Sequence, residues 1–141
     1  MASTIDLLNE LLALHCYSLP RYLVNARPWV SRSDSSAVEA LALVAADHQR
    51  MTDLIGSLIL DLGGAIQPGE FPMMYTDMHD LSSEYIVNET LRFQRLEIAR
   101  IEEIASKLSD QPKPHAIAKE ALGAAKGHVQ NLSELLSKST A

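Results

Sequence analysis

Hydrophobic residues recur at alternating steps of three and four along several stretches of the chain, and segments rich in proline, glycine and serine separate these stretches. The stretches cover approximately residues 4–26, 35–64, 77–108 and 114–137. This spacing puts the apolar side chains on one face of each helix, as the core of a helical bundle requires. Strand-like alternation of apolar and polar positions is essentially absent. The chain is therefore predicted to be all-α.

The ends of the predicted helices carry start and stop signals. Ser3 or Thr4 can cap the first helix, and Pro28 with the serines after it marks the first loop. Gly63-Gly64 is a strong C-terminal stop for the second helix. The breaks between helices are therefore predicted as firmly as the helices themselves.

The connection between the second and third predicted helices is much longer than the others. A turn of a few residues is enough to join antiparallel neighbours. Here about 14 extended residues reach roughly 45 Å, enough to return along a helix on the order of 40 Å long. We therefore expect one domain over residues 1–141, a four-helix bundle with a long crossover that leaves the second and third helices parallel.

A polar residue interrupts the apolar face of each predicted helix near its middle: His15, His48, Gln94 and His128. Mid-helix positions of packed helices of similar length lie at similar depth, so these side chains are predicted to meet in one layer of the core. A buried polar group without a partner costs about 1–3 kcal/mol. Several such groups would consume much of a stability of roughly 5–15 kcal/mol. They must therefore bond to each other, to an ordered water or to a ligand.

Three neutral imidazoles and an amide oxygen form a ligand set for zinc, copper or nickel, with iron less favoured. Met51 lies one turn beyond His48 on the same face and adds a possible thioether ligand, which would favour Cu(I). The residues predict a mononuclear transition-metal site with the candidate ligands His15, His48, His128, Gln94 and Met51, and no organic cofactor. The alternative is a hydrogen-bonded polar layer that fixes helix register in a structural, dimerising bundle without a metal.

Pro20 lies five residues after His15, near the end of the first predicted helix. Because proline has no N–H, it cannot donate a hydrogen bond to the carbonyl of Cys16. Such a break either introduces a kink or bulge that re-aims His15, or bends the end of the helix toward the loop. The sequence leaves both alternatives open.

Composition narrows the possible partners. The 12 basic and 18 acidic residues give a net charge of −6, which argues against a nucleic-acid groove or a basic membrane-binding face. No apolar run approaches the roughly 20 residues of a membrane span, and the N-terminus lacks the layout of a secretion signal. Cys16 is the single cysteine, which excludes an internal disulfide and suits a reducing compartment. A cytoplasmic location is therefore expected.

The residues around the polar positions resemble the ferritin-like superfamily, which includes bacterioferritins and rubrerythrins. LNELLALH followed by Tyr22 resembles the bacterioferritin opening, in which a ligand glutamate stands at the place of His15. DLGG resembles the motif that ends the second helix of that family, and LRFQRLEIAR looks like its third ligand helix, with Gln94 at the glutamate. KGHVQNLSELL resembles the closing motif, with His128 at the histidine. The resemblance covers nearly the whole chain and implies the same bundle with a long crossover.

The resemblance also implies which ligands have been replaced. Counting back from Gly64 places His48 and Met51 at the glutamate and histidine of the family's Glu-x-x-His motif. A register shifted by one turn would instead make His48 the histidine and Ala45 the lost glutamate, and Ala125 stands at the glutamate of the last helix. Iron oxidation in this family needs carboxylates that hold two irons, so ferroxidase activity is not expected. A metal-binding ferritin-like protein without an identifiable catalytic residue or substrate is expected instead.

Two further predictions concern the surface. Carboxylates that fall outside the apolar faces are expected to be solvated: Glu39, Asp47, Glu97, Glu102 and Glu103. A second apolar stripe beside the core faces is wider than one bundle needs: Leu7, Leu11, Leu14, Leu43 and Leu54. This stripe predicts a symmetric homodimer, with contact to the connection around residues 71–75 as the alternative.

Overall fold

The structure is a computed structural model that describes residues 3–23, 35–67, 69 and 83–139. All regular secondary structure in these ranges is α-helical, as the hydrophobic spacing predicts. The helices are α1 (Thr4–Cys16), α2 (Leu19–Leu23), α4 (Ser35–Asp61), α5 (Ser83–Lys107) and α6 (Pro112–Ser139). The predicted start of the third helix at residue 77 lies outside the described residues.

The first predicted helix is wrong in one respect, because it is two helices and not one. α1 ends at Cys16, and α2 begins at Leu19. Pro20 cannot bond to the carbonyl oxygen of Cys16, and the guanidinium of Arg21 donates to that oxygen instead, over 2.8 Å. Arg21 also donates to the side-chain oxygen of Gln49 on α4, which attaches α2 to its neighbour. The break between α1 and α2 is therefore stabilised by specific hydrogen bonds and is not a frayed helix end.

The ends of α1 and α4 follow from their sequences. The Ser3 side chain accepts a hydrogen bond from the Asp6 backbone N–H and caps α1. After α4, Gly63 has a φ of 80°, a conformation that glycine adopts at little cost. The Gly64 N–H bonds to the Ile59 oxygen and the Gly63 N–H to the Leu60 oxygen, which forms a Schellman motif. The predicted glycine stop is therefore confirmed.

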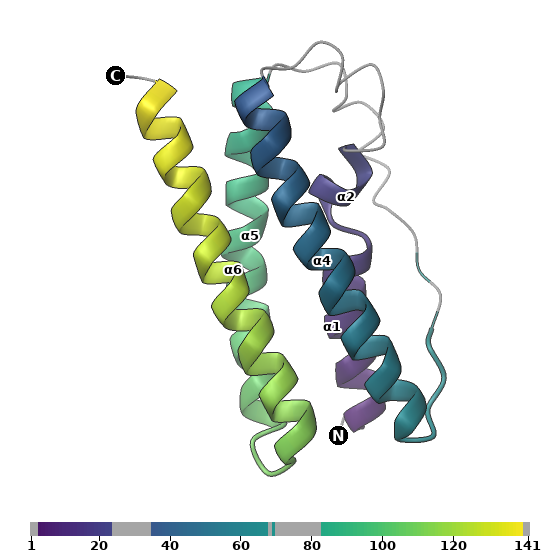
Figure 1. Cartoon of the computed structure of the whole chain (residues 1–141). Helices are drawn as coiled ribbons and strands as arrows, with labels where there is room; N and C mark the ends of the chain where they lie inside the picture. Colours follow the sequence, from purple (N-terminus) through teal and green to yellow (C-terminus); the bar gives the residue numbers. More distant parts are fainter. Residues whose placement is uncertain (1–2, 24–34, 68, 70–82, 140–141) are drawn as a thin grey trace.

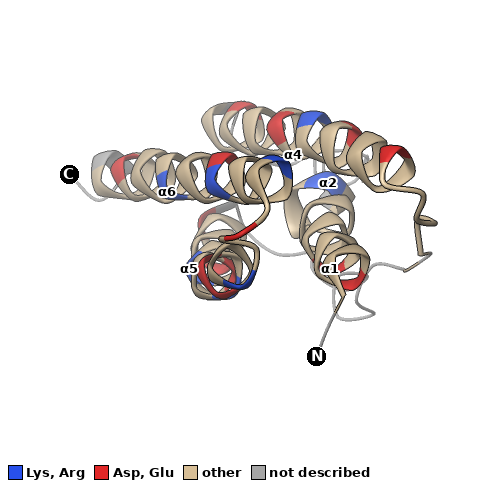
Figure 2. Cartoon of the chain, turned by 90° about the horizontal axis from the view of Figure 1, so that it is seen from below, with Lys and Arg blue, Asp and Glu red and all other residues tan. Residues whose placement is uncertain are grey.

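The long helices lie alongside one another (Figure 1). α1 and α6 run toward the top of that view, whereas α4 and α5 run toward the bottom, so α4 and α5 point in the same direction. α1 packs most extensively on α4, and α5 on α6. Figure 2 shows acidic and basic residues interspersed along the helices. Within the described ranges, no helix combines the length and apolar character needed to cross a bilayer.

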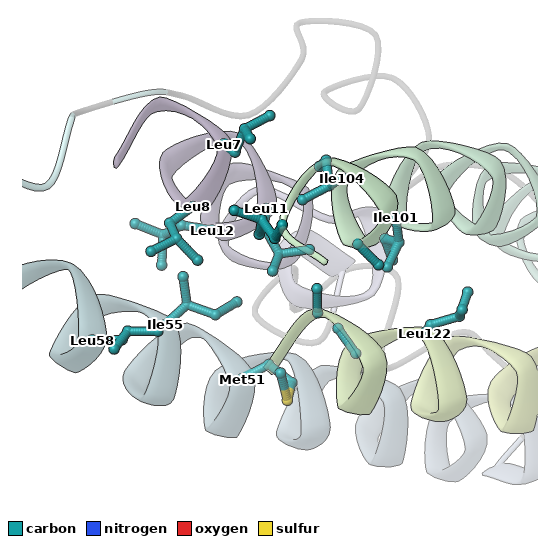
Figure 3. Close-up of a cluster of buried hydrophobic side chains, with 14 of the residues drawn as sticks. Leu7, Leu8, Leu11, Leu12, Met51, Ile55, Leu58, Ile101, Ile104 and Leu122 are labelled. Carbon is teal, nitrogen blue, oxygen red and sulfur yellow. The ribbon is translucent and has the colours of Figure 1, made fainter. Parts of the chain in front are cut away.

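The core consists of two apolar clusters stacked along the helices. The first apolar cluster lies where α1 begins and α4 ends (Figure 3), and its members include Leu8, Leu12, Met51, Ile55, Ile101, Ile104 and Ala125. The second apolar cluster lies near α2 and includes Leu19, Leu41, Ile86, Leu91 and Leu132. Burial of these apolar side chains is the main stabilising contribution to the fold.

Part of the apolar stripe that predicts a dimer is buried by contacts within the chain. Leu7 and Leu11 are buried members of the first apolar cluster, and Leu14 is partly buried against it. Leu43 and Leu54 of the same stripe are exposed, Leu43 by 71%. Contacts within one chain therefore account for the α1 half of the stripe, and the homodimer stays a prediction; the alternative contact around residues 71–75 lies outside the described residues.

Candidate metal site in the polar core layer

The four polar residues that interrupt the apolar faces of the predicted helices lie at the boundary between the two apolar clusters. Along the chain, each polar residue stands between a residue of one cluster and a residue of the other, counting the partly buried neighbours of each cluster. The flanking pairs are Leu12 and Leu19 for His15, Leu41 and Met51 for His48, Leu91 and Ile98 for Gln94, and Ala125 and Leu132 for His128. His15, His48 and Gln94 are buried, and the His128 side chain is 15% exposed. We call these four residues the polar layer.

His48 lies in ring contact with both of the other imidazoles of the polar layer. The ring centres of His15 and His48 are 5.1 Å apart, and those of His48 and His128 are 5.8 Å apart. Both pairs of ring planes meet at 85°. The structure thus brings together three histidines that are far apart in the sequence, at the level that their helical positions predict.

Each imidazole is held by one of its two nitrogens. The Nδ1–H of His15 donates to the Leu11 carbonyl oxygen over 2.8 Å, and the Nε2–H of His128 donates to Asp47 Oδ2 over 2.9 Å. Nδ1 of His48 shares a hydrogen bond of 2.7 Å with Ser18 Oγ. In the described part of the chain, the other nitrogen of each ring has no hydrogen-bond partner. Metal-binding histidines are commonly held in this way, with the second nitrogen bonded to a carbonyl, a carboxylate or another polar group.

Burial keeps the inner imidazoles neutral. It lowers the pKa of His48 to about 3, with further lowering from His15 and His128, and burial also lowers the pKa of His15. Both rings therefore keep a lone pair on one nitrogen at neutral pH, which is the form that binds a metal. Burial opposes the ionisation of Asp47, but hydrogen bonds from His128 and Arg50 outweigh it and lower the pKa of its carboxyl.

Two carboxylates that were expected on the solvated surface lie beside the polar layer. Asp47 is partly buried and accepts the hydrogen bond of His128, so its placement on a solvated face is wrong. Glu97 is also partly buried, accepts a hydrogen bond of 3.2 Å from Gln94 Nε2, and has a pKa raised by burial to about 8. Asp47 stands one position before His48, and Glu97 stands three positions after Gln94. The sequence analysis did not assign either residue to the site, and this proximity is the only sequence signal that could have found them.

Gln94 and Thr90 contribute oxygen atoms that lack a partner. Both residues are buried in α5, with exposed fractions of 1% and 0%. Gln94 Oε1 and Thr90 Oγ1 are buried and make no hydrogen bond in the described part of the chain. Buried polar atoms of this kind are rare in native proteins and often mark an unseen water or ion.

Met51 is fully buried one turn from His48, where the sequence places it. Figure 3 shows its side chain among the apolar residues of the first apolar cluster. Its structural setting is that of core packing, and its role as a thioether ligand stays a prediction.

The ring separations of two of the pairs are compatible with a metal ion shared by the two rings of each pair. An imidazole bound through nitrogen has its ring centre about 3.2 Å from zinc, so two such rings at a tetrahedral angle have centres about 5.2 Å apart. The His15–His48 separation of 5.1 Å and the His48–His128 separation of 5.8 Å are close to this value. Among the described residues, however, no three His, Cys, Asp or Glu side chains already surround one point as metal ligands do. Metal binding therefore requires at least one ring to turn.

A hollow lies away from the polar layer, between α1, α4 and the segment after α4. It has a volume of about 480 Å³ and is lined by Cys16, Tyr17, Asp53 and Ile66 among others. Asn9 holds this segment by accepting from the Gln67 N–H and donating to the Ala65 oxygen. Cys16 is partly buried and lines this hollow.

Comparison with models of known protein families and with curated proteins finds no match to this chain.

Proposed function

We propose that this chain is a ferritin-like four-helix bundle with a long crossover, and that its polar layer binds one transition-metal ion in place of a di-iron centre. The shared direction of α4 and α5 supports this topology, because the connection between them has to span the length of the bundle. In this proposal α1 and α2 together form the first helix of the bundle.

One observation carries the metal proposal. Three imidazoles lie in ring contact at one level of the bundle, each is held through one nitrogen, and the other nitrogen of each ring has no hydrogen-bond partner in the described part of the chain. Imidazoles held in this way are the usual ligands of a transition-metal ion. His15, His48 and His128 are the proposed ligands, with Gln94 Oε1 at the same level.

The donor set selects the class of metal. Imidazole nitrogens suit zinc, copper and nickel. Asp47 and Glu97 are the carboxylates nearest the layer, but each is engaged with a layer residue and neither bridges two sites. We therefore propose Zn(II), Cu or Ni(II) as the bound ion and do not propose ferroxidase activity.

Metal titration of the apo protein tests this proposal. We expect wild-type protein to bind about one equivalent of Zn(II) or Co(II) per chain, and a His15→Ala, His48→Ala, His128→Ala variant to bind none. His115→Ala is the matched control, because His115 lies on α6 with its Nδ1 bonded to the Ala105 oxygen, outside the layer. His48→Gln serves as a second variant should the triple variant fail to fold. Wild-type protein that binds no metal contradicts the proposal.

The second candidate function is a structural bundle in which the polar layer fixes helix register and a second copy binds elsewhere. The absence of an assembled ligand cluster among the described residues favours this candidate. It predicts an apo dimer whose melting temperature does not change when a chelator or a metal is added. Sedimentation of the apo protein with and without EDTA distinguishes it from the metal-binding proposal.

A further inference from the structure

The last turns of α4 and the first turns of α6 border a hollow on the surface. It has a volume of about 360 Å³, and its lining includes the apolar residues Leu54, Leu58, Ala116 and Ile117. Leu54 is 40% exposed although it is a large apolar side chain, and Leu43 on the same helix is 71% exposed. Leu43 and Leu54 are close to three helical turns apart, so they lie on one line along α4. Along this line, α4 keeps apolar surface that no other described residue covers.

Two opposite charges at this hollow have no partner. Asp61 ends α4 and Lys113 lies in the first turn of α6, and both line the hollow. Both are exposed, and neither side chain forms a hydrogen bond or an ion pair with a described residue. Further along the same two helices, Arg50 pairs with Glu120 over 3.4 Å, with about half of each side chain exposed. We call this surface the α4–α6 face and define it by Arg50, Leu54 and Asp61 of α4 and Lys113, Ile117 and Glu120 of α6.

The charges of the α4–α6 face are complementary to those of a second copy. α4 and α6 run in opposite directions (Figure 1), so Asp61 lies at the level of Lys113, and Arg50 lies at the level of Glu120. A two-fold axis parallel to both helices and midway between them places α4 of one copy against α6 of the other, with each residue at its own level. Asp61 of each copy then lies opposite Lys113 of the other, and Arg50 lies opposite Glu120. All charges of the face thereby meet charges of opposite sign.

We propose that the α4–α6 face binds the same face of a second copy of this chain and forms a two-fold symmetric dimer. The same axis places the exposed Leu54 of each copy over Ile117 of the other, so the apolar part of the hollow is covered together with the charges. Leu43, further along the same line of α4, extends the apolar contact. None of these residues belongs to the polar layer, so the dimer is independent of the proposed metal binding.

The charge pattern favours a second copy over a different partner. The two basic and two acidic residues of the α4–α6 face cancel, so the face does not attract a strongly acidic or a strongly basic molecule. An unpaired acid and an unpaired base on opposite sides of one hollow are self-complementary under the two-fold axis, which fixes the orientation of the two copies. Packing α4 on α4 of the second copy would not pair Asp61 with Lys113.

Sedimentation equilibrium of the apo protein tests the apolar part of this interface. We expect wild-type protein to dimerise, and Leu54→Lys to weaken the dimer about 100-fold, or about tenfold for each of the two copies that carry the change. Leu96→Lys is the matched control, because Leu96 is 60% exposed on α5 and lies outside the α4–α6 face. Wild-type protein that stays monomeric, as it would if a different partner covered this face, overturns the proposal. A Leu54→Lys protein that dimerises as tightly as wild type also overturns it.

Charge reversal tests the orientation of the two copies. Asp61→Lys sets two basic groups opposite each other in the dimer and Lys113→Asp sets two acidic groups opposite each other, so each variant alone should dimerise more weakly than wild type. Mixed in equal amounts, the two variants should form heterodimers, because each contact between the copies again joins a base to an acid. Native mass spectrometry of the mixture counts the heterodimers, and circular dichroism of each variant alone shows that it is folded. Folded variants that form no more heterodimer than random exchange gives would overturn the proposed pairing.

Discussion

Ser18 Oγ lies 2.7 Å from Nδ1 of His48, across the break between α1 and α2. The bond exists because the chain leaves the helix at Cys16 and re-enters it at Leu19, which brings a buried serine to the level of the layer. Pro20 causes the break and Arg21 stabilises it by bonding to the Cys16 oxygen. The sequence offered two interpretations of Pro20, a kink that re-aims His15 or a bend toward the loop; the structure shows a break between two helices, and the residue that this break brings to the layer is Ser18.

Removing the Ser18 hydroxyl leaves His48 without its partner in the core. We expect Ser18→Ala to lower the free energy of unfolding by about 1–3 kcal/mol, because a buried imidazole nitrogen loses its hydrogen bond. Urea denaturation of apo protein at pH 7.5 measures this change. Ser57→Ala on the exposed side of α4 is the control. A Ser18→Ala protein as stable as wild type would show that this bond does not hold the ring.

Asp47 orients His128 through its carboxylate. We expect Asp47→Asn to weaken metal binding about 10- to 100-fold, the usual effect of losing the group that holds a metal-binding histidine. Competition with a chromophoric chelator gives the affinity. Asp53→Asn is the matched control, because Asp53 is an exposed carboxylate on the same helix that accepts a bond from Gln49. Equal affinities for both variants would exclude a role for Asp47 in the site.

Acid should destabilise the apo protein through its buried histidines. The pKa of His48 is lowered to about 3 and that of His15 is also lowered, whereas an unfolded imidazole titrates at about 6.5. The unfolded state therefore binds more protons below about pH 6.5, and stability that is fully present above this pH is lost as the pH falls toward about 3. Each histidine contributes a slope of about 1.4 kcal/mol per pH unit at most.

Urea denaturation between pH 7.5 and 5 tests this dependence. The titration of Glu97 opposes that of the histidines over this range, so the measurement uses Glu97→Gln apo protein. We expect this variant to lose stability from pH 7.5 to 5, and the same variant with His48→Leu to lose less because one titrating histidine is gone. A stability of the Glu97→Gln protein that stays constant over this range would show that these rings are not buried as neutral groups.

Glu97 has the opposite pH dependence. Burial raises the pKa of its carboxyl to about 8, from about 4.5 in an unfolded chain, so its contribution to stability is present below about pH 4.5 and lost as the pH rises through 8. Glu97→Gln keeps an acceptor for Gln94 and removes the ionisation. We expect the variant to be more stable than wild type by a margin that grows from pH 5 to pH 9. A margin that does not change over this range would contradict the burial of the charge.

The sequence predicts which residues form the polar layer better than it predicts which residues bond to them. The steps of three and four residues place His15, His48 and Gln94 inside because helical periodicity alone decides which side of a helix a residue faces. The Gly63-Gly64 stop is equally local, since a left-handed glycine ends a helix without help from its neighbours.

The partners of the imidazoles could not be predicted, because they depend on how helices pack. Asp47 lies beside the apolar face of α4, and it reaches His128 only because α6 packs against that side of α4. Ser18 reaches His48 because the break after Cys16 shifts the chain, and a regular helix would place it elsewhere. Glu97 was expected to be solvated because it is charged, but the packing of α5 partly buries it.

The most direct test of the account is anomalous diffraction from crystals of the protein grown with Zn(II), recorded on both sides of the zinc absorption edge. The account predicts one strong peak inside the bundle, within bonding distance of imidazole nitrogens from His15, His48 and His128. A peak elsewhere, or no peak in crystals in which these three rings are well ordered, would contradict metal binding at the polar layer.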